Sequence, residues 1–208
     1  MIEKIINYIK RIQNERITRK NSLDEIHKWM DAGKPIPPPS AYKQKVIKDF
    51  GKETRYKILV ETGTYLGEMV YAQLNNFSKI YSIELAETLF KNAVTRFKKD
   101  MHVTILHGDS GKVLMNVMPQ ITQPAIFWLD GHYSGDITAK GDKECPVFEE
   151  LKCIFNFFDY HHLLLIDDAR LFVGANDYPS IDELSDFIST YRPQAILNVE
   201  NDIIIVKT

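Results

Sequence analysis

Short apolar runs alternate with amphipathic helical stretches through most of the chain. Five runs have the length and composition of strands: Ile58–Val60, Ile80–Ile83, Val103–Leu106, Ala125–Leu129 and Leu163–Ile166. Between them apolar residues recur at helical spacing, most clearly where Leu85, Leu89 and Phe97 fall on one face. Continuous apolar strands separated by helices predict a parallel sheet that is covered by helices on both faces.

The last part of the chain departs from this alternation. Ser180 begins another amphipathic helix, with Glu183 three residues later as its capping-box partner. The final strand candidates, Ala195–Val199 and Ile203–Val206, are joined by a segment too short for a helical crossover, so they must pair as an antiparallel hairpin. The pattern predicts an α/β fold with a Rossmann-like, doubly wound, seven-stranded sheet, mostly parallel and closed by this hairpin.

The first fifty residues have a different pattern. Residues 2–17 place isoleucines at helical spacing among charged residues, which predicts an N-terminal helix. We interpret it as packing on its own domain; a dimer contact, making a homo-oligomer, and a membrane-surface helix are the alternatives. Prolines between residues 35 and 39 predict a stiff connector, followed by a short helix over Ala41–Phe50. We therefore expect a helical extension over residues 1–50 and one domain over residues 51–208.

Composition narrows the class of protein. The chain has 208 residues, 44% hydrophobic and 26% charged, with a net charge of −2, typical of a globular protein without general affinity for nucleic acid. Cys145 and Cys153 are too few for a disulfide framework, and we expect reduced thiols in a cytoplasmic protein. No apolar run approaches a membrane span, and charges within the first residues argue against a signal peptide.

The turn after the first strand candidate is the most informative stretch. Glu61 is followed by Gly63 and Gly67 at a strand-to-helix turn, which brings backbone close to a nucleotide-like ligand. Glu84 ends the next apolar run, where a ribose-binding carboxylate is expected, since its two oxygens suit a vicinal diol. The G-x-G-x-x-G run of nicotinamide-binding domains is missing, which favours S-adenosylmethionine over NAD.

Five motifs together resemble the class I S-adenosylmethionine-dependent methyltransferases, in particular a bacterial group of largely undefined substrate. They are Glu61-x-Gly63-x-x-x-Gly67, Tyr81-Ser-Ile-Glu84, His107-Gly-Asp-Ser110, Phe127-Trp-Leu-Asp-Gly-His-Tyr-Ser-Gly135 and Leu165-Ile-Asp-Asp168. The resemblance extends from about Pro35 to the C-terminus. It implies that S-adenosylmethionine is the cofactor, and five βα units closed by a hairpin are the layout of this class.

The resemblance also implies roles for the first turn. Glu61 would lie near the cofactor's ammonium group, directly or through water. Gly63, Thr64 and Gly67 would line the methionine part, and a side chain at Gly63 would obstruct its approach. The chain departs from the usual motif at Tyr65, within Thr64-Tyr65-Leu66, where many methyltransferases have another glycine.

The next two strand ends carry the remaining cofactor candidates. Glu84 would accept hydrogen bonds from both ribose hydroxyls. Asp109, with Ser110 beside it, would accept from the adenine amino group. Both residues also favour helix N-caps, so a capping role is the alternative. Asp130, after the fourth strand, belongs to the cofactor set too.

Three aspartates form a candidate metal site. Asp130 ends the fourth strand, and Asp167 and Asp168 end the fifth. Metal-dependent small-molecule and sugar O-methyltransferases place such carboxylates around Mg²⁺ or a similar divalent cation, a choice that suits oxygen ligands. The alternative is that Asp167 or Asp168 caps a loop or pairs with Arg170, leaving no metal.

Asp130 and His132 are the catalytic candidates. Asp130 ends the fourth strand, where the catalytic face of such a sheet lies. His132 could act as general base on a hydroxyl; contact with the cofactor and a place in the pocket wall are the alternatives. Residues 131–146 form a long polar connection, which we interpret as a substrate-facing lid. The sequence thus predicts a methyltransferase acting on an oxygen of a hydroxylated small molecule or glycan. An NAD-dependent oxidoreductase and a non-catalytic cofactor-binding module are the alternatives.

Overall fold

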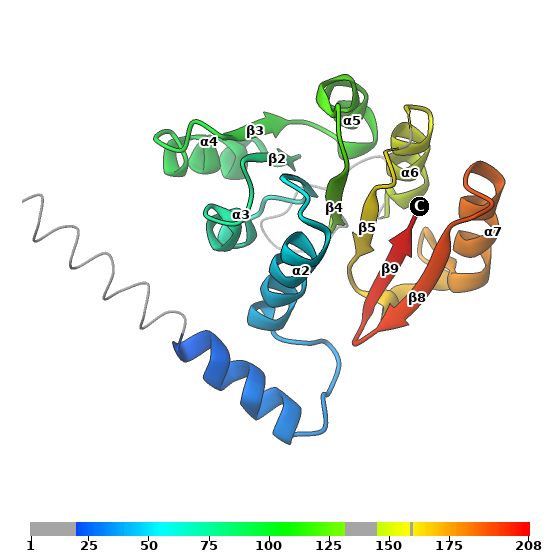
Figure 1. The fold of residues 1–208 in the computed structure, drawn as a ribbon, viewed down its shortest axis with the longest axis horizontal. Helices are drawn as coiled ribbons and strands as arrows, with labels where there is room; N and C mark the ends of the chain where they lie inside the picture. Colours follow the sequence, from blue (N-terminus) through cyan, green and yellow to red (C-terminus); the bar gives the residue numbers. More distant parts are fainter. Residues whose placement is uncertain (1–19, 132–144, 159) are drawn as a thin grey trace, which may run out of the picture. The chain divides into compact units, whose positions relative to one another are not determined.

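The computed structural model describes residues 20–131, 145–158 and 160–208. Its contacts divide the chain into two units, Met1–Val46 and Ile47–Thr208, and each is described by itself (Figure 1). The domain boundary expected at residue 50 stays a prediction. The amphipathic helix expected over residues 2–17 lies outside the described residues.

Within the first unit, residues 20–31 are helical. Trp29, in its last turn, joins this helix to the residues that follow: its Nε1 donates to the Pro35 carbonyl at 2.7 Å, and the centre of its ring lies 4.5 Å from that of Tyr42. Tyr42 belongs to helix α2 (Ser40–Thr54), which contains the helix expected over Ala41–Phe50 and continues into the second unit. None of the helices in the described ranges is long and apolar enough to cross a bilayer.

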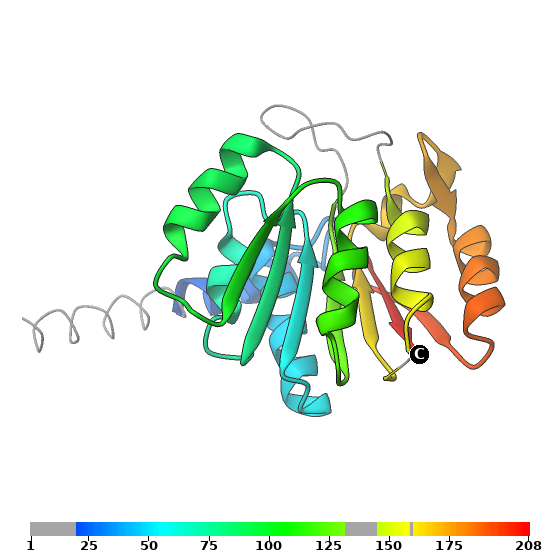
Figure 2. The ribbon, with the colours of Figure 1, turned by 90° about the horizontal axis from the view of Figure 1, so that it is seen from above.

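The second unit is built on a seven-stranded sheet. Figure 2 shows its strands side by side across the view. The strands are β1 (Ile58–Thr62), β2 (Lys79–Glu84), β3 (Val103–His107), β4 (Ala125–Leu129), β5 (Leu163–Ile166), β8 (Ile196–Glu200) and β9 (Ile203–Lys207). Their order is β3-β2-β1-β4-β5-β9-β8. Strand β9 pairs antiparallel with both β5 and β8, and the other pairs in this sheet are parallel, so β9 runs opposite to the remaining strands. The predicted doubly wound sheet and its closing hairpin are confirmed.

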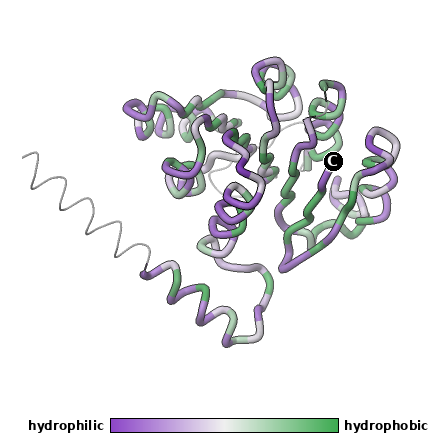
Figure 3. Tube along the Cα trace, viewed as in Figure 1, coloured by the Kyte–Doolittle hydropathy of each residue, from purple (hydrophilic) through white to green (hydrophobic). Residues whose placement is uncertain are grey.

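Helices cover both faces of this sheet. They are α3 (Glu68–Gln73), α4 (Glu87–Arg96), α5 (Ser110–Val117), α6 (Val147–Phe155) and α7 (Ile181–Tyr191), with short 3-10 turns η1 (Met118–Gln120) and η2 (Ala169–Leu171). Helices α5, α6 and α7 stand in a row on one face (Figure 2). Every residue of β1, β4 and β5 is buried, as expected of strands covered on both sides. Hydrophobic residues follow one another along the central strands, whereas they alternate with hydrophilic residues along the helices (Figure 3).

One hairpin was not predicted. Strands β6 (Val173–Ala175) and β7 (Tyr178–Ser180) form a separate two-stranded sheet between β5 and α7. Its turn residues, Asn176 and Asp177, both have positive φ, which suits the right-handed twist of a tight hairpin. The Asn-Asp pair was the available signal, but three-residue strands are too short for their periodicity to be read.

Candidate functional site

The register of the sheet brings the predicted site residues to one edge. Thr62 pairs with Ile83 on one side and with Leu129 on the other, and Leu129 pairs with Ile166. The residues that follow these positions therefore leave the sheet at its carboxyl edge, where open α/β sheets bind ligands. Glu84, Asp130 and Asp167 follow these positions directly. Asp109 comes two residues after the end of β3, and Glu61 is the residue before Thr62 in β1, so residues far apart in the sequence belong to this edge.

The turn after β1 passes very close to β4. Gly63 has φ of 85°, and its N–H donates to the Ile83 carbonyl at 2.9 Å. A Cβ atom built on Gly63 would overlap the Asp130 carbonyl oxygen and lie 3.0 Å from the carbonyl carbon. The protein's own backbone therefore requires glycine here, in addition to any ligand that approaches the turn.

At the other end of the turn, Tyr65 stands where many methyltransferases have another glycine. Tyr65 adopts φ of 50°, a left-handed conformation that costs a side-chain-bearing residue about 1 kcal/mol. Its backbone N–H donates to Glu84 Oε2 at 2.7 Å, which holds the strained residue in place. Gly67 has φ of 78°, and a Cβ there would lie 2.7 Å from the Phe97 ring.

Glu84 is buried and fixed at the end of β2. Its Oε2 accepts the Tyr65 N–H, and its Oε1 accepts the Ala86 N–H at 2.8 Å. Each carboxylate oxygen has two lone-pair sites, so these bonds orient the group without using its full capacity. The arrangement is compatible with a diol ligand, and the ribose role stays a prediction.

Glu61 ends a buried polar chain that the sequence did not reveal. Ser82 Oγ donates to Glu61 Oε2 at 2.5 Å and lies 2.6 Å from Thr64 Oγ1. Burial raises the pKa of Glu61 to about 8; the Ser82 hydrogen bond opposes this, whereas the charges of Asp130 and Glu84 add to it. A cation arriving among these carboxylates would favour the ionised form of Glu61.

Asp109 and Ser110 begin helix α5. Asp109 is its N-cap and accepts the Gly111 N–H at 2.9 Å, so the capping alternative is what the structure displays. Ser110 is buried, and its hydroxyl donates to Glu150 Oε1 on α6 at 2.5 Å. Sequence reasoning missed Glu150, because nothing local connects residues 40 positions apart. The adenine role of Asp109 and Ser110 stays a prediction.

The predicted metal site does not assemble as a ligand set. Asp168 Oδ1 accepts from Arg170 Nη1 at 2.7 Å, which is the alternative that the sequence offers to metal binding. Asp167 Oδ1 accepts the Asp168 N–H at 2.8 Å. Over the described ranges, no three His, Cys, Asp or Glu side chains form a group that could hold a metal ion. Asp130, Asp167 and Asp168 as placed therefore do not fit a divalent cation.

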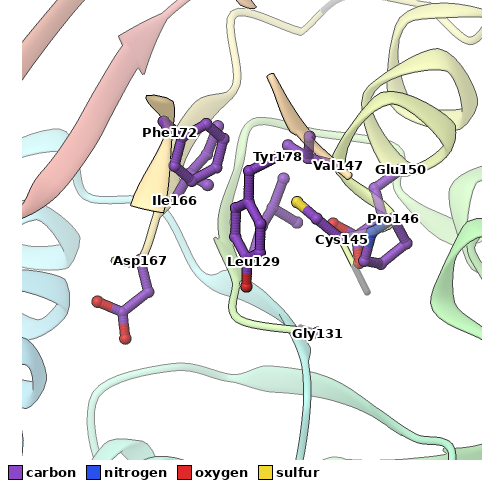
Figure 4. Close-up of a pocket in the computed structure, with 10 residues that line it drawn as sticks. All are labelled: Leu129, Gly131, Cys145, Pro146, Val147, Glu150, Ile166, Asp167, Phe172 and Tyr178. Atoms are coloured by element: carbon purple, nitrogen blue, oxygen red, sulfur yellow. The ribbon is translucent and has the colours of Figure 1, made fainter. Parts of the chain in front are cut away.

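His132 and most of the predicted lid over residues 131–146 lie outside the described residues. The described residues on either side of this gap, Gly131 and Cys145, help to line a pocket (Figure 4). Its other lining residues are Leu129, Pro146, Val147, Glu150, Ile166, Asp167, Phe172 and Tyr178. Tyr178, from the unpredicted hairpin, packs edge-on against Phe172 at 5.5 Å. Burial raises the pKa of the Cys145 thiol to about 12, so this cysteine is no nucleophile at neutral pH.

Comparison with solved structures identifies the fold as that of class I S-adenosylmethionine-dependent methyltransferases. A putative caffeoyl-CoA O-methyltransferase from Staphylococcus aureus matches 98% of this chain and 99% of its own, with a TM-score of 0.58 and 13% identity. An O-methyltransferase from Bacillus cereus, in complex with S-adenosylhomocysteine (SAH), matches 90% and 91%, with a TM-score of 0.58 and 13% identity.

A putative rRNA methylase from Clostridium thermocellum matches 79% of this chain and 93% of its own, with a TM-score of 0.51 and 13% identity. No protein-family model matches the sequence, and no curated protein matches it. The fold is therefore shared by methyltransferases with different acceptors, and at these identities it does not specify the acceptor.

Proposed function

We propose that the protein is a methyltransferase that transfers a methyl group from S-adenosylmethionine to an oxygen of a hydroxylated small molecule or glycan. The observation that carries this proposal is the pairing of the Gly63 turn with the buried Glu84 carboxylate. The two lie on adjacent strand ends and are tied together by the Tyr65 N–H. Such a turn beside such a carboxylate suits a nucleoside with a ribose diol.

Charge around Glu61 supports a cationic ligand. Glu61 is buried in an environment that Glu84 and Asp130 make more negative. S-adenosylmethionine carries a sulfonium and an ammonium, whereas NAD⁺ carries two phosphates that the charges of Glu84 and Asp130 would repel. The same set of groups therefore favours the first ligand over the second.

The proposed chemistry is a displacement at carbon. When bound, S-adenosylmethionine supplies an electrophilic methyl group on its sulfonium. The bond from the methyl carbon to the acceptor oxygen forms as the carbon–sulfur bond breaks, and the acceptor hydroxyl loses its proton. The chain's task is to hold that hydroxyl in line, which we assign to Asp130 beside the pocket at the ends of β4 and β5. His132 stays the predicted base, and no step is assigned to a metal.

The pocket supports an acceptor with hydroxyl groups. Tyr178, Asp167 and Glu150 offer it a phenol and two carboxylates at a partly apolar wall. Carboxylates accept hydrogen bonds from hydroxyls and repel anionic substituents, which disfavours a nucleic-acid phosphate backbone. The cytoplasmic location and a homo-oligomer formed through the N-terminal helix stay predictions.

Calorimetry tests the cofactor. Wild-type protein should bind S-adenosylmethionine and SAH but not NAD⁺. Glu84→Gln should weaken binding of S-adenosylmethionine at least about tenfold, because a charge-assisted hydrogen bond is worth 1.5 kcal/mol or more. Glu87→Gln, three residues further on at an exposed position, is the matched control and should bind normally. Tight NAD⁺ binding without S-adenosylmethionine binding would sink the proposal.

Turnover requires a second experiment. S-adenosylmethionine with a labelled methyl group is incubated with nucleotide sugars and small hydroxylated metabolites, and label transfer is measured. Label on a hydroxyl oxygen supports the proposal. Cofactor binding without transfer to any acceptor class would favour the non-catalytic module instead.

A further inference from the structure

The turn between β8 and β9 reaches the end of β5. Strand β9 runs antiparallel to β5 with Ile204 opposite Ile166, so Asp202 falls beside the residues that follow β5. Asn201 and Asp202 both have positive φ, which makes the turn tight. Asp202 is buried, and its backbone carbonyl accepts the Ala169 N–H at 2.9 Å.

Arg170 joins this turn to the end of β5. Its Nη1 donates to Asp168 Oδ1 at 2.7 Å and also to Asp202 Oδ2. Its backbone N–H donates to Asp202 Oδ1 at 2.7 Å, so side chain and backbone both bind the same carboxylate. We call Asp168, Arg170 and Asp202 the arginine bridge.

The arginine bridge is well suited to neutralise buried carboxylates. Asp168 and Asp202 are 7% and 6% exposed, so each needs a partner for its charge. Partial burial alone would lower the pKa of Arg170, but the hydrogen bonds and charges of Asp168 and Asp202 outweigh burial and raise it. The guanidinium of Arg170 is always charged, is part of the chain and makes directional contacts with carboxylates, whereas a metal ion must bind from solution.

We propose that Arg170 is the resident cation at the end of β5 and keeps divalent ions from binding Asp167 and Asp168. A divalent ion on Asp168 would share that carboxylate with a guanidinium and be repelled by it. Mg²⁺ also demands near-octahedral oxygen ligands, and Asp168 Oδ1 already accepts from Arg170. Where the inference extends to catalysis, it rests on the proposed function: methyl transfer should then need no divalent cation.

Titration of the full-length protein with Mn²⁺, followed by the paramagnetic resonance signal of the free ion, tests the inference. Wild type should bind no more Mn²⁺ than Asp168→Asn does. Arg170→Met should gain binding at least about tenfold tighter than wild type, because the repelling charge is gone. Arg192→Met, which removes another half-buried arginine whose contacts include the backbone carbonyls of Phe155 and Phe157, should gain none.

Two results would overturn the inference. One is Mn²⁺ binding by wild type that is lost in Asp168→Asn, which needs no arginine variant and so holds even if Arg170→Met fails to fold. The other is a folded Arg170→Met, judged by circular dichroism, that gains no binding. The titration needs neither cofactor nor acceptor, so its outcome is separate from that of the methyltransferase proposal. If turnover is found, its persistence in excess EDTA supports the inference, and its loss there, with recovery on adding Mg²⁺, contradicts it.

Discussion

Replacing Gly63 by alanine separates the glycine's structural role from its role toward a ligand. A Cβ at this position would overlap the Asp130 carbonyl group, which follows β4. The turn or the strand end must retreat by about 1 Å to restore ordinary contact. The backbone also has φ of 85°, a conformation that alanine rarely adopts.

The cost is the sum of two terms. The left-handed backbone contributes roughly 1 kcal/mol and the overpacking roughly 2 kcal/mol, so Gly63→Ala should lower the free energy of unfolding by about 3 kcal/mol. Gly174→Ala is the matched control. Gly174 has φ of 78° in the same unit, but a Cβ there would meet no atom closer than 3.8 Å. It should therefore lose only about 1 kcal/mol, the backbone term.

Urea denaturation of both variants measures the difference. Trp128 is buried in β4, two residues before Asp130, so its fluorescence reports directly on this part of the sheet. Equal losses for Gly63→Ala and Gly174→Ala would refute the steric argument. If Gly63→Ala loses S-adenosylmethionine binding but keeps its stability, glycine is needed at this position only to let the ligand approach.

Three further predictions concern single side chains. Because the folded-state pKa of Glu61 lies near 8, above its ordinary value of 4.5, folding takes up a proton between these values. The free energy of unfolding should thus decrease as pH rises from about 5 to 8, by up to about 1.4 kcal/mol per pH unit. Denaturation of Glu61→Gln, measured across the same pH range, should show a smaller slope. An equal slope in the variant would contradict the assignment of this pH dependence to Glu61. Asp109→Ser keeps an N-cap oxygen but shortens its reach, so it should preserve the melting temperature and weaken S-adenosylmethionine binding in calorimetry; unchanged affinity would leave Asp109 with the capping role only. Ser180→Ala removes the observed capping box of α7 and should cost about 1 kcal/mol in urea denaturation, whereas Glu183→Gln, which can still accept from the Ser180 N–H, should cost less.

Local chemistry explains why much of the fold could be predicted. Strands β4 and β5 are apolar along their whole length, and β1 is apolar over Ile58–Val60, because both faces of the sheet are covered there; this is visible in the residues themselves. The capping box of Ser180 and Glu183 is a signal spanning three residues, and the structure contains it as expected. The segment between the last two strands is too short for any arrangement but a hairpin. Each of these features depends on neighbours in the chain.

The candidate site was predictable only in part. Its position followed from the rule that parallel strands end at one edge, so the glycine turn and Glu84 could be assigned to it from the sequence. What each side chain contacts did not follow. Ser110 faces Glu150 on another helix, and Tyr178 reaches the pocket from a hairpin whose strands are too short to show a period.

The sequence by itself determined which segments form strands and helices, and that the carboxylates and the glycine turn gather at one edge of the sheet. Only the tertiary structure decided that Gly63 must be glycine because of Asp130, and that Asp168 pairs with Arg170 and Asp202. These contacts join strands that are neighbours in the sheet but distant in the chain, as with Gly63 against the end of β4 and Asp202 beside the end of β5. Periodicity and spacing report on a residue's own segment, whereas the partner of a buried charge depends on which strand the fold places beside it.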